Sequence, residues 1–321
     1  MSVTNLFKQE KTFSTYNKDQ AEHYAHIRPN YHSSVYDTIR SHHSSTGGQF
    51  GSLLDVGCGP GTATHSLAPY FTETFAIDPS EGMIQAAQST SGDKDTSKSV
   101  RFGVSTASKL GSDLSPAIPD NSVDLIISGN AAHWFNLDEF WPNAARVLKP
   151  GGSVALWTSG GLHVHPSTPN AAAIEAALLQ LEETHLVPYF EPGNRLTRDG
   201  YKSLALPWTL DTPVKDFDES TFFRRDWTVD EQFLERQRAV NMDQLEKILG
   251  VGSPVTRWRE AHPHAIGTEE DVVRKGRRVT ERLLHEAGVK EGEELLQPAI
   301  CGTLLIVKKV SNAENYLDPQ V

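Results

Sequence analysis

The chain has 321 residues, a formal net charge of −11 and only two cysteines, Cys58 and Cys301. The acidic excess argues against a nucleic-acid partner, whose phosphates need a basic surface, and two cysteines cannot build a disulfide framework. No apolar run approaches the ~20 residues that span a bilayer, and the first residues lack the apolar core of a signal peptide, so we expect a cytoplasmic protein that acts on a small molecule and not at a membrane.

The chain opens with helices that carry several tyrosines. Residues 12–40 have the composition of two helical pieces interrupted at Arg28-Pro29, because proline cannot donate the backbone hydrogen bond of a helix interior. Tyr24 and Tyr31 flank this break. We interpret the segment as a helical collar that packs on a sheet.

A strand, a glycine turn and a helix come next. Residues 53–56 form a short apolar run of the buried-strand type, and residues 62–70 have a helical composition. Between them stand Gly57, Gly59 and Gly61. Glycine accepts the positive φ angles of a turn across a strand end and lets the backbone approach a ligand, so this turn is expected to bind one.

Two acids select the kind of ligand. Asp55 lies inside the strand before the glycines, and Asp78 ends a second apolar run about 20 residues past the turn, where a strand-end acid accepts hydrogen bonds from both ribose hydroxyls. Asp55 suits the ammonium of a methionine-like ligand better than a diphosphate. The spacing G-x-G-x-G also departs from the dinucleotide pattern G-x-G-x-x-G. The pattern D-V-G-C-G-P-G-T resembles the first motif of class I S-adenosylmethionine-dependent methyltransferases. A nicotinamide cofactor, or a glycine turn without a ligand, remains the alternative.

The next strand ends supply further cofactor contacts. Pro79 and Met83 follow Asp78 at the start of a helix, where Met83 lies against an adenine face or in the core. Thr106 and Ala107 follow a strand expected over 100–105. Family members often have an acid at the position of Thr106 that meets the adenine amino group, and the resemblance leads us to expect Thr106 or the Ala107 backbone in that role here.

A fourth strand, expected over 123–128, leads to the presumed substrate side. The residues after it include Asn130, His133 and Trp134, at the strand edge where open α/β sheets bind ligands. We expect Asn130 to face the cofactor, and His133 and Trp134 to face the acceptor. A helix over 137–148 and a strand over 153–158 follow.

Taken together, these motifs resemble one branch of the family. In order and spacing, L-L-D-V-G-C-G-P-G-T, I-D-P-S-x-x-M-I, S-V-D-L-I-I-S, A-A-H-W-F-N, R-V-L-K-P-G-G and A-L-W-x-x-G are similar to the trans-aconitate methyltransferase-like branch. The lead-in around Arg28-Pro29 resembles its Y-x-x-x-R-P-x-Y-P element, with His32 where proline is usual. Residues 188–195 resemble its P-Y-x-x-P-G-x-R element.

The resemblance implies a fold, a cofactor and site residues. The fold is a doubly wound, mostly parallel seven-stranded α/β sheet whose last strand, over 302–310, is antiparallel. The cofactor is S-adenosyl-L-methionine, whose amino-acid end would face Tyr24 and Arg28. The remaining substrate contacts would be Tyr31, Trp157, Tyr189 and Arg195.

We expect a single methyltransferase domain over 1–321. Its parts are a collar over 1–50, a cofactor-binding core over 51–160, a lid insertion over 161–219 and a C-terminal part over 220–321. Within them the composition predicts helices over 171–184, 229–248 and 269–286 and a strand over 220–227. The H-x-H pairs at 163/165 and 262/264 lack a third ligand, so no metal is expected. The oligomeric state is left open.

Two chemistries are open for the acceptor. Methyl transfer from a sulfonium is an in-line displacement, so alignment in a dry site does much of the catalysis. A carboxylate needs no base and would be oriented by an arginine such as Arg28 or Arg195. A hydroxyl, phenol, amine or thiol needs a base, for which His133 is the candidate unless it only buttresses Trp134. We favour O-methylation, and the alternative is a protein that binds S-adenosylmethionine without transferring the methyl group.

Overall fold

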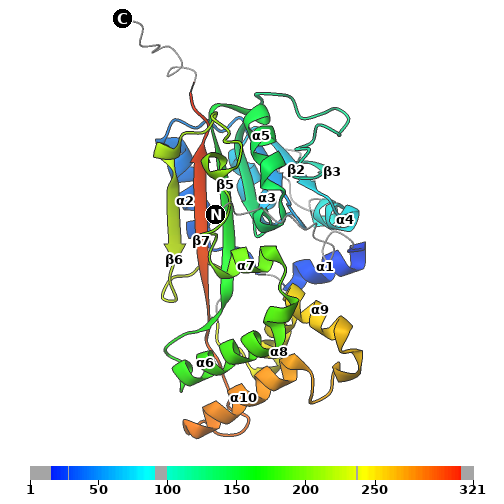
Figure 1. Ribbon diagram of the computed structural model, residues 1–321, viewed down its shortest axis with the longest axis vertical. Coiled ribbons are helices and arrows are strands. Elements are labelled where there is room, and N and C mark those ends of the chain that lie inside the picture. Colours follow the sequence, from blue (N-terminus) through cyan, green and yellow to red (C-terminus); the bar gives the residue numbers. More distant parts are fainter. Residues whose placement is uncertain (1–15, 28, 91–99, 236–237, 312–321) are drawn as a thin grey trace, which may run out of the picture.

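The computed structural model describes residues 16–27, 29–90, 100–235 and 238–311. Its centre is a seven-stranded sheet of order β3-β2-β1-β4-β5-β7-β6 (Figure 1). The strands are β1 Ser52–Val56, β2 Glu73–Asp78, β3 Val100–Val104, β4 Val123–Gly129, β5 Leu148–Val164, β6 Phe223–Trp227 and β7 Pro298–Lys308. Only β7 runs antiparallel to its neighbours, β5 and β6. The predicted mostly parallel sheet with an antiparallel last strand is confirmed.

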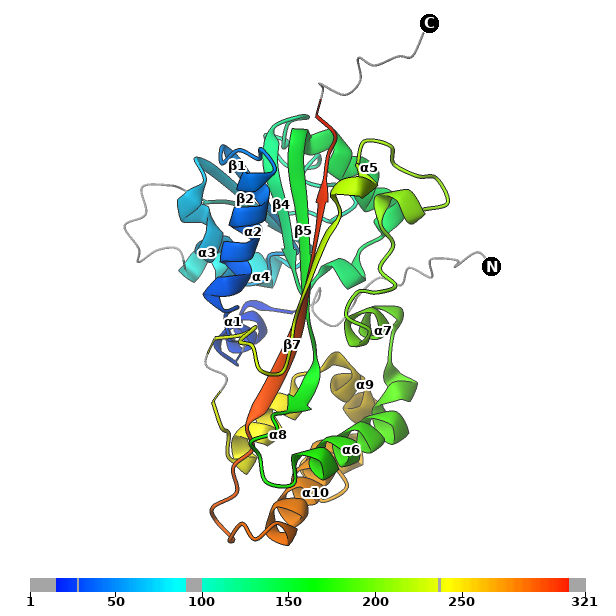
Figure 2. The same cartoon turned by 90° about the vertical axis from the view of Figure 1, so that its left-hand side faces the viewer.

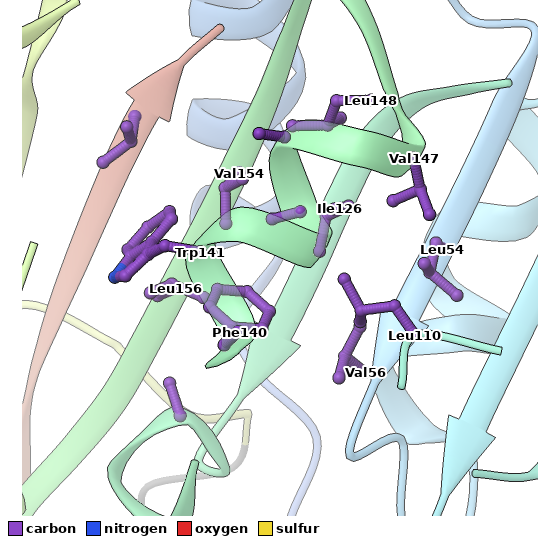
Figure 3. Packing of buried hydrophobic residues seen from close by; sticks show 14 of the residues in the cluster. Leu54, Val56, Leu110, Ile126, Phe140, Trp141, Val147, Leu148, Val154 and Leu156 are labelled. Carbon is purple, nitrogen blue, oxygen red and sulfur yellow. The ribbon is translucent and has the colours of Figure 1, made fainter. Parts of the chain in front are cut away.

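Helices cover both faces of the sheet (Figure 2). On one face lie α2 Ser33–Ser45 and α3 Thr62–Leu67, and on the other lies α5 Leu137–Val147. The strands are apolar on both faces because both are covered. Figure 3 shows Phe140 and Trp141 of α5 directed at Ile126, Val154 and Leu156 of β4 and β5, all five with no exposed surface. This packing fixes the position of α5 on β4 and β5.

The collar lies over one end of that edge. Helix α1 Lys18–Ile27 packs on α4 Glu81–Thr90, which follows β2. The contact is close, since a Cβ at Gly82 would lie 2.3 Å from the carbonyl oxygen of Tyr16. The hydroxyl of Ser80 also donates to that carbonyl at 3.3 Å. The backbone at Tyr16 is therefore held beside the residues that follow β2.

Strand β5 is much longer than predicted. The expected strand over 153–158 runs from Leu148 to Val164, because its pairing with β7 resumes after a shift between Ser159 and Leu162 and continues to the pair Val164 and Pro298. Beyond the carboxyl edge, β5 and β7 thus form a two-stranded arm (Figure 2).

The arm carries a helical cap. Its helices are α6 Ala171–Leu181, α8 Met242–Gly250, α9 Ser253–Ala261 and α10 Val272–Glu286, and they gather at the end of the molecule beyond the carboxyl edge (Figure 1). Two apolar clusters hold these helices together. The cap therefore draws on the expected lid insertion and also on the C-terminal part of the chain.

The helix predicted over 229–248 is wrong in its first half. The helix α8 begins only after Asn241, whose side chain accepts a hydrogen bond from the backbone N–H of Gln244 at 2.9 Å in a capping box. Before it, Phe233 is fully buried and lies against Gly302 of β7. Tertiary burial of this aromatic ring overrides the helical composition. Among the residues that the structure describes, no helix is long and apolar enough to cross a membrane.

Candidate active site

The glycine turn has the backbone that the sequence predicts. Gly57, Gly59 and Gly61 have φ angles of 68°, 54° and 84°, in the left-handed region that favours glycine. A Cβ at Gly57 would lie 2.6 Å from the Cβ of Ala131, whereas a Cβ at Gly59 would meet nothing within 4 Å. Gly57 is thus required by packing, and Gly59 faces open space where a ligand can approach the backbone.

Asp78 is held against this turn. The backbone N–H of Gly59 donates to its Oδ2 at 2.9 Å, and that of Ser80 donates to its Oδ1 at 2.9 Å. The residue is 8% exposed. An ionised carboxylate has about four acceptor positions, so hydrogen bonds to both oxygens fix its orientation and leave it able to accept from a ribose diol.

Asp55 is a buried acid with an unsatisfied oxygen. The Thr64 hydroxyl donates to its Oδ2 at 2.6 Å, and Oδ1 has no hydrogen-bond partner among the described residues. Burial raises the pKa of Asp55 to about 7, outweighing the hydrogen bond from Thr64. A buried carboxylate with an unsatisfied oxygen gains from a cationic partner, so the site fits the ammonium of a methionine-like ligand.

Asn130 joins three elements at the end of β4. In a left-handed conformation, with φ of 54°, its Nδ2 donates to the hydroxyl of Tyr31 at 2.9 Å. Its Oδ1 accepts from the backbone of Ser159 at 2.8 Å and from the Thr158 hydroxyl at 3.0 Å. This amide therefore fixes the position of β5 and of the segment before α2.

Two of the predicted substrate residues lie in the packed core. Tyr31 is 6% exposed and Trp157 is fully buried, and their rings meet edge to face with centroids 5.4 Å apart. Trp157 also lies against Gly129, where a Cβ would be 2.6 Å from the indole. Both side chains support the strand ends, and contact with a substrate stays a prediction.

His133 lies in a 3-10 helix, η3 Ala132–Trp134, and has a partner that the sequence did not indicate. Its Nδ1 is 2.8 Å from the hydroxyl of Tyr201. Tyr201 is 2% exposed and has a φ of 59°. The ring of His133 is 4.9 Å from that of Trp134, centroid to centroid. The imidazole is thus half-buried between two aromatic rings.

Helix α7 Pro192–Arg198 connects this turn to the cap. A Cβ at Gly193 would lie 2.6 Å from the Trp134 ring and 2.8 Å from the carbonyl oxygen of His133. The guanidinium of Arg257, on α9, donates to the carbonyl of Tyr189 at 2.8 Å and to Oδ1 of Asn194 at 2.5 Å. The segment over 188–195 therefore bridges η3 and α9.

Two further residues, Tyr189 and Arg195, were predicted to contact the substrate. Tyr189 is half-buried, with its ring 6.0 Å from that of His262. Arg195 is exposed and lies two residues beyond Gly193, about 200° around the helix and thus away from η3. Its predicted role toward the substrate stays a prediction.

On the cofactor side, Met83 is 3% exposed and packs with Ala21 of α1. Thr106 and Pro79 are exposed and Ala107 is half-buried. Arg28 and the side chain of Tyr24 lie outside the described residues.

Sequence reasoning missed three residues of this site. Thr64 follows the glycine turn in an ordinary helical segment, Tyr201 lies in a loop without periodicity, and Arg257 belongs to a helix that was not expected. A threonine one turn into the helix after a buried strand acid is a signal that could have indicated Thr64. No local pattern indicated the other two.

Comparisons with known proteins find similarity to methyltransferases over the first half of the chain. Residues 54–156 match a family model described as "Methyltransferase domain". The chain is 37% identical over 138 residues to a Saccharomyces cerevisiae protein described as "Probable S-adenosylmethionine-dependent methyltransferase CRG1", covering 43% of this chain and 45% of that protein. It is 35% identical over 137 residues to a Dictyostelium discoideum protein described as "Putative methyltransferase DDB_G0268948", covering 43% of this chain and 46% of that protein. The chain thus spans somewhat less than half the length of these curated relatives.

One solved structure covers nearly the whole fold. A protein from Anaeromyxobacter dehalogenans, described as "a Putative Type II Methyltransferase", is 25% identical with a TM-score of 0.57, and the match covers 88% of this chain and 97% of that one. The fold is thus the Rossmann-like α/β fold found in class I methyltransferases. In particular, residues 54–156 are similar to a methyltransferase domain and lie in the part of the sheet that carries the glycine turn.

Proposed function

We propose that the whole chain is an S-adenosylmethionine-dependent methyltransferase that transfers the methyl group to oxygen of a small molecule. The observation that supports this proposal most directly is the pair Asp55 and Asp78, at the ends of adjacent strands on either side of a glycine turn. One acid is buried with an unsatisfied oxygen, and the other is held by two backbone N–H groups.

Each of these residues would bind a different part of the cofactor. Asp55 would take the ammonium, the backbone at Gly59 would lie against the ligand, and Asp78 would accept from the ribose hydroxyls. The end of β3, at Thr106 and Ala107, would meet the adenine. When bound, S-adenosylmethionine supplies a methyl carbon activated by a cationic sulfur.

On the acceptor side, the protein's part is alignment and exclusion of water. His133 and Trp134 stand at the end of β4, and α7 packs on them from the direction of the cap. A carboxylate acceptor would need only orientation, whereas a hydroxyl acceptor would pass its proton to a base, for which His133 is the candidate. Membership of the trans-aconitate methyltransferase-like branch, which rests on the quoted motifs, is part of the same proposal.

The test is formation of S-adenosylhomocysteine from S-adenosylmethionine over a panel of acceptors. The panel contains the carboxylates trans-aconitate, benzoate and cinnamate and the phenols catechol and 4-hydroxybenzaldehyde. We expect turnover with at least one acceptor, and calorimetric binding of S-adenosylhomocysteine by the wild type. Binding without turnover of any acceptor would favour a protein that only binds the cofactor. Absence of binding would contradict both functions.

A further inference from the structure

Trp157 is a buried tryptophan whose indole N–H has no hydrogen-bond partner among the residues that the structure describes. Trp141, which likewise has no exposed surface, donates from Nε1 to the carbonyl oxygen of Ala205 at 3.0 Å. A buried indole N–H usually has such a partner, because a donor taken out of water without one loses a hydrogen bond and gains none. The indole of Trp157 is therefore a donor in need of an acceptor.

The ring of Trp157 is fixed, with its nitrogen over strand β4. A Cβ at Gly129, which is opposite Trp157 in the pairing of β4 with β5, would be 2.9 Å from Nε1. The rings of Tyr31 and Tyr36 meet the indole edge to face, with centroids 5.4 Å and 6.4 Å from that of Trp157. Because the ring is held by these contacts, its N–H is preorganised for an acceptor above β4.

The unsatisfied oxygen of Asp55 belongs to the same face of the sheet. Leu53 and Trp157 lie in the apolar cluster on the face that α2 and α3 cover, whereas Leu54 lies in the cluster on the α5 face. Side chains alternate along a strand, so Asp55 projects to the same face as Leu53. Its hydrogen bond from Thr64 of α3 agrees with this direction.

The two groups flank β4 near its carboxyl end. In the register of the sheet Asp55 of β1 is opposite Ile127, and Trp157 of β5 is opposite Gly129, two residues further along β4. Strand β4 lies between β1 and β5. Within the described part of the chain, one buried acceptor and one buried donor without partners thus lie on either side of a single strand.

We propose that Nε1 of Trp157 binds the carboxylate at the methionine end of S-adenosylmethionine, while Asp55 binds its ammonium. The inference rests on the proposed function and deepens it, and it moves Trp157 from the substrate side, where the sequence predicted it, to the cofactor side. A zwitterion satisfies a buried acceptor and a buried donor together. A carboxylate without the ammonium would be repelled by Asp55, and an ammonium without the carboxylate would leave the indole without an acceptor.

The test compares two ligands that differ only in the carboxylate, S-adenosylhomocysteine and its decarboxylated analogue, by calorimetry on the intact protein. Trp157→Phe keeps an aromatic ring and removes the donor. We expect this variant to bind S-adenosylhomocysteine about 10-fold more weakly than the wild type, because a hydrogen bond to a charged group is lost. Its affinity for the decarboxylated analogue should change less than about twofold, because that ligand has no carboxylate for the indole to bind.

Trp141→Phe is the matched control. It also removes the N–H of a tryptophan without exposed surface, but this N–H donates to the backbone of Ala205. Its affinities for both ligands should equal those of the wild type. Asp55→Asn should weaken both ligands, because both carry the ammonium.

NMR of the indole ¹H–¹⁵N groups provides a second measurement, on the wild type alone. The signal of Trp157 is assigned among the six tryptophans through its backbone resonances. It should move downfield when S-adenosylhomocysteine is added, because a hydrogen bond to a carboxylate deshields the proton. The decarboxylated analogue should not produce that shift.

Two results would overturn the inference alone. One is an equal loss of affinity for both ligands in Trp157→Phe, which would show that the ring acts by packing. The other is an indole signal of Trp157 that stays in place while S-adenosylhomocysteine binds, and this result does not depend on whether the variant folds. Failure of the wild type to bind S-adenosylhomocysteine would contradict the proposed function, and the inference with it.

Discussion

Replacing Asp55 by asparagine should make the ligand-free protein more stable while it loses its cofactor. In the wild type the carboxyl has an ordinary pKa of 3.8 when the chain is unfolded and about 7 when it is folded, chiefly because of burial. The folded state therefore holds the proton more tightly. The contribution of Asp55 to the free energy of unfolding is therefore largest below pH 3.8 and decreases as the pH rises toward 7. Above pH 7 it no longer changes with pH.

The magnitude follows from the two pKa values. At about 1.4 kcal/mol per pH unit, the burial of the charge costs about 4 kcal/mol above pH 7. Asparagine avoids that cost and still accepts from the Thr64 hydroxyl, but its amide NH₂ would take the place of Oδ1, which has no partner among the described residues. An unsatisfied buried amide costs about 1–3 kcal/mol. The net gain expected at pH 8 is about 1–3 kcal/mol.

The assay is urea unfolding at pH 5.5 and pH 8 together with calorimetry of S-adenosylhomocysteine. From pH 5.5 to 8 the wild type should lose about 2 kcal/mol relative to Asp55→Asn, because about 1.5 pH units lie between 5.5 and the folded pKa. The Asp211→Asn variant, which removes an exposed carboxylate, is the control. Its free energy of unfolding should change between the two pH values as that of the wild type does. Ligand affinity should fall about 10-fold or more in Asp55→Asn, since its cationic end loses a counter-charge.

Two results would refute this reasoning. One is that Asp55→Asn is less stable than the wild type at pH 8, or that the difference in stability is the same at both pH values. Either finding would show that the buried charge of Asp55 does not destabilise the ligand-free protein. If the variant keeps full affinity for S-adenosylhomocysteine, the ammonium does not lie at Asp55.

The other predictions concern the turn and its neighbours. Gly59→Ala and Gly151→Ala both place alanine at a positive φ with nothing within 4 Å of the new Cβ, so thermal unfolding should show a similar loss of about 1–2 kcal/mol for both. Calorimetry should show a loss of S-adenosylhomocysteine binding in Gly59→Ala only. Equal affinity of the two variants would contradict the proposed position of the cofactor at Gly59. Asp78→Asn should weaken that binding about 10-fold, because the amide accepts hydrogen bonds at one oxygen only, whereas unchanged affinity would rule out a ribose contact. Gly193→Ala should destabilise the fold by about 1–3 kcal/mol through its clash with the Trp134 ring, and a variant as stable as the wild type would show that α7 does not pack tightly there.

The amino-acid sequence by itself determined the sheet and indicated which residues of its carboxyl edge are candidates for binding a cofactor. Short apolar runs that end in glycine or an acid are local patterns, and the carboxyl ends of parallel strands meet at one edge whatever the rest of the chain does. For that reason the positions of Asp55, Asp78 and the three glycines at one edge of the sheet could be predicted before any coordinates. The family resemblance of the same segment is likewise a local property, because it depends on the order and spacing of motifs.

Only the tertiary structure decided the cap and the partners of the acceptor side. The length of β5 depends on its pairing with β7, which lies more than 130 residues later in the chain. The late start of α8 depends on the burial of Phe233 against β7. The contact between His133 and Tyr201 joins residues that are 68 positions apart. No periodicity or turn signal encodes such pairings, because burial and hydrogen bonding between distant segments are settled only when the whole chain has packed.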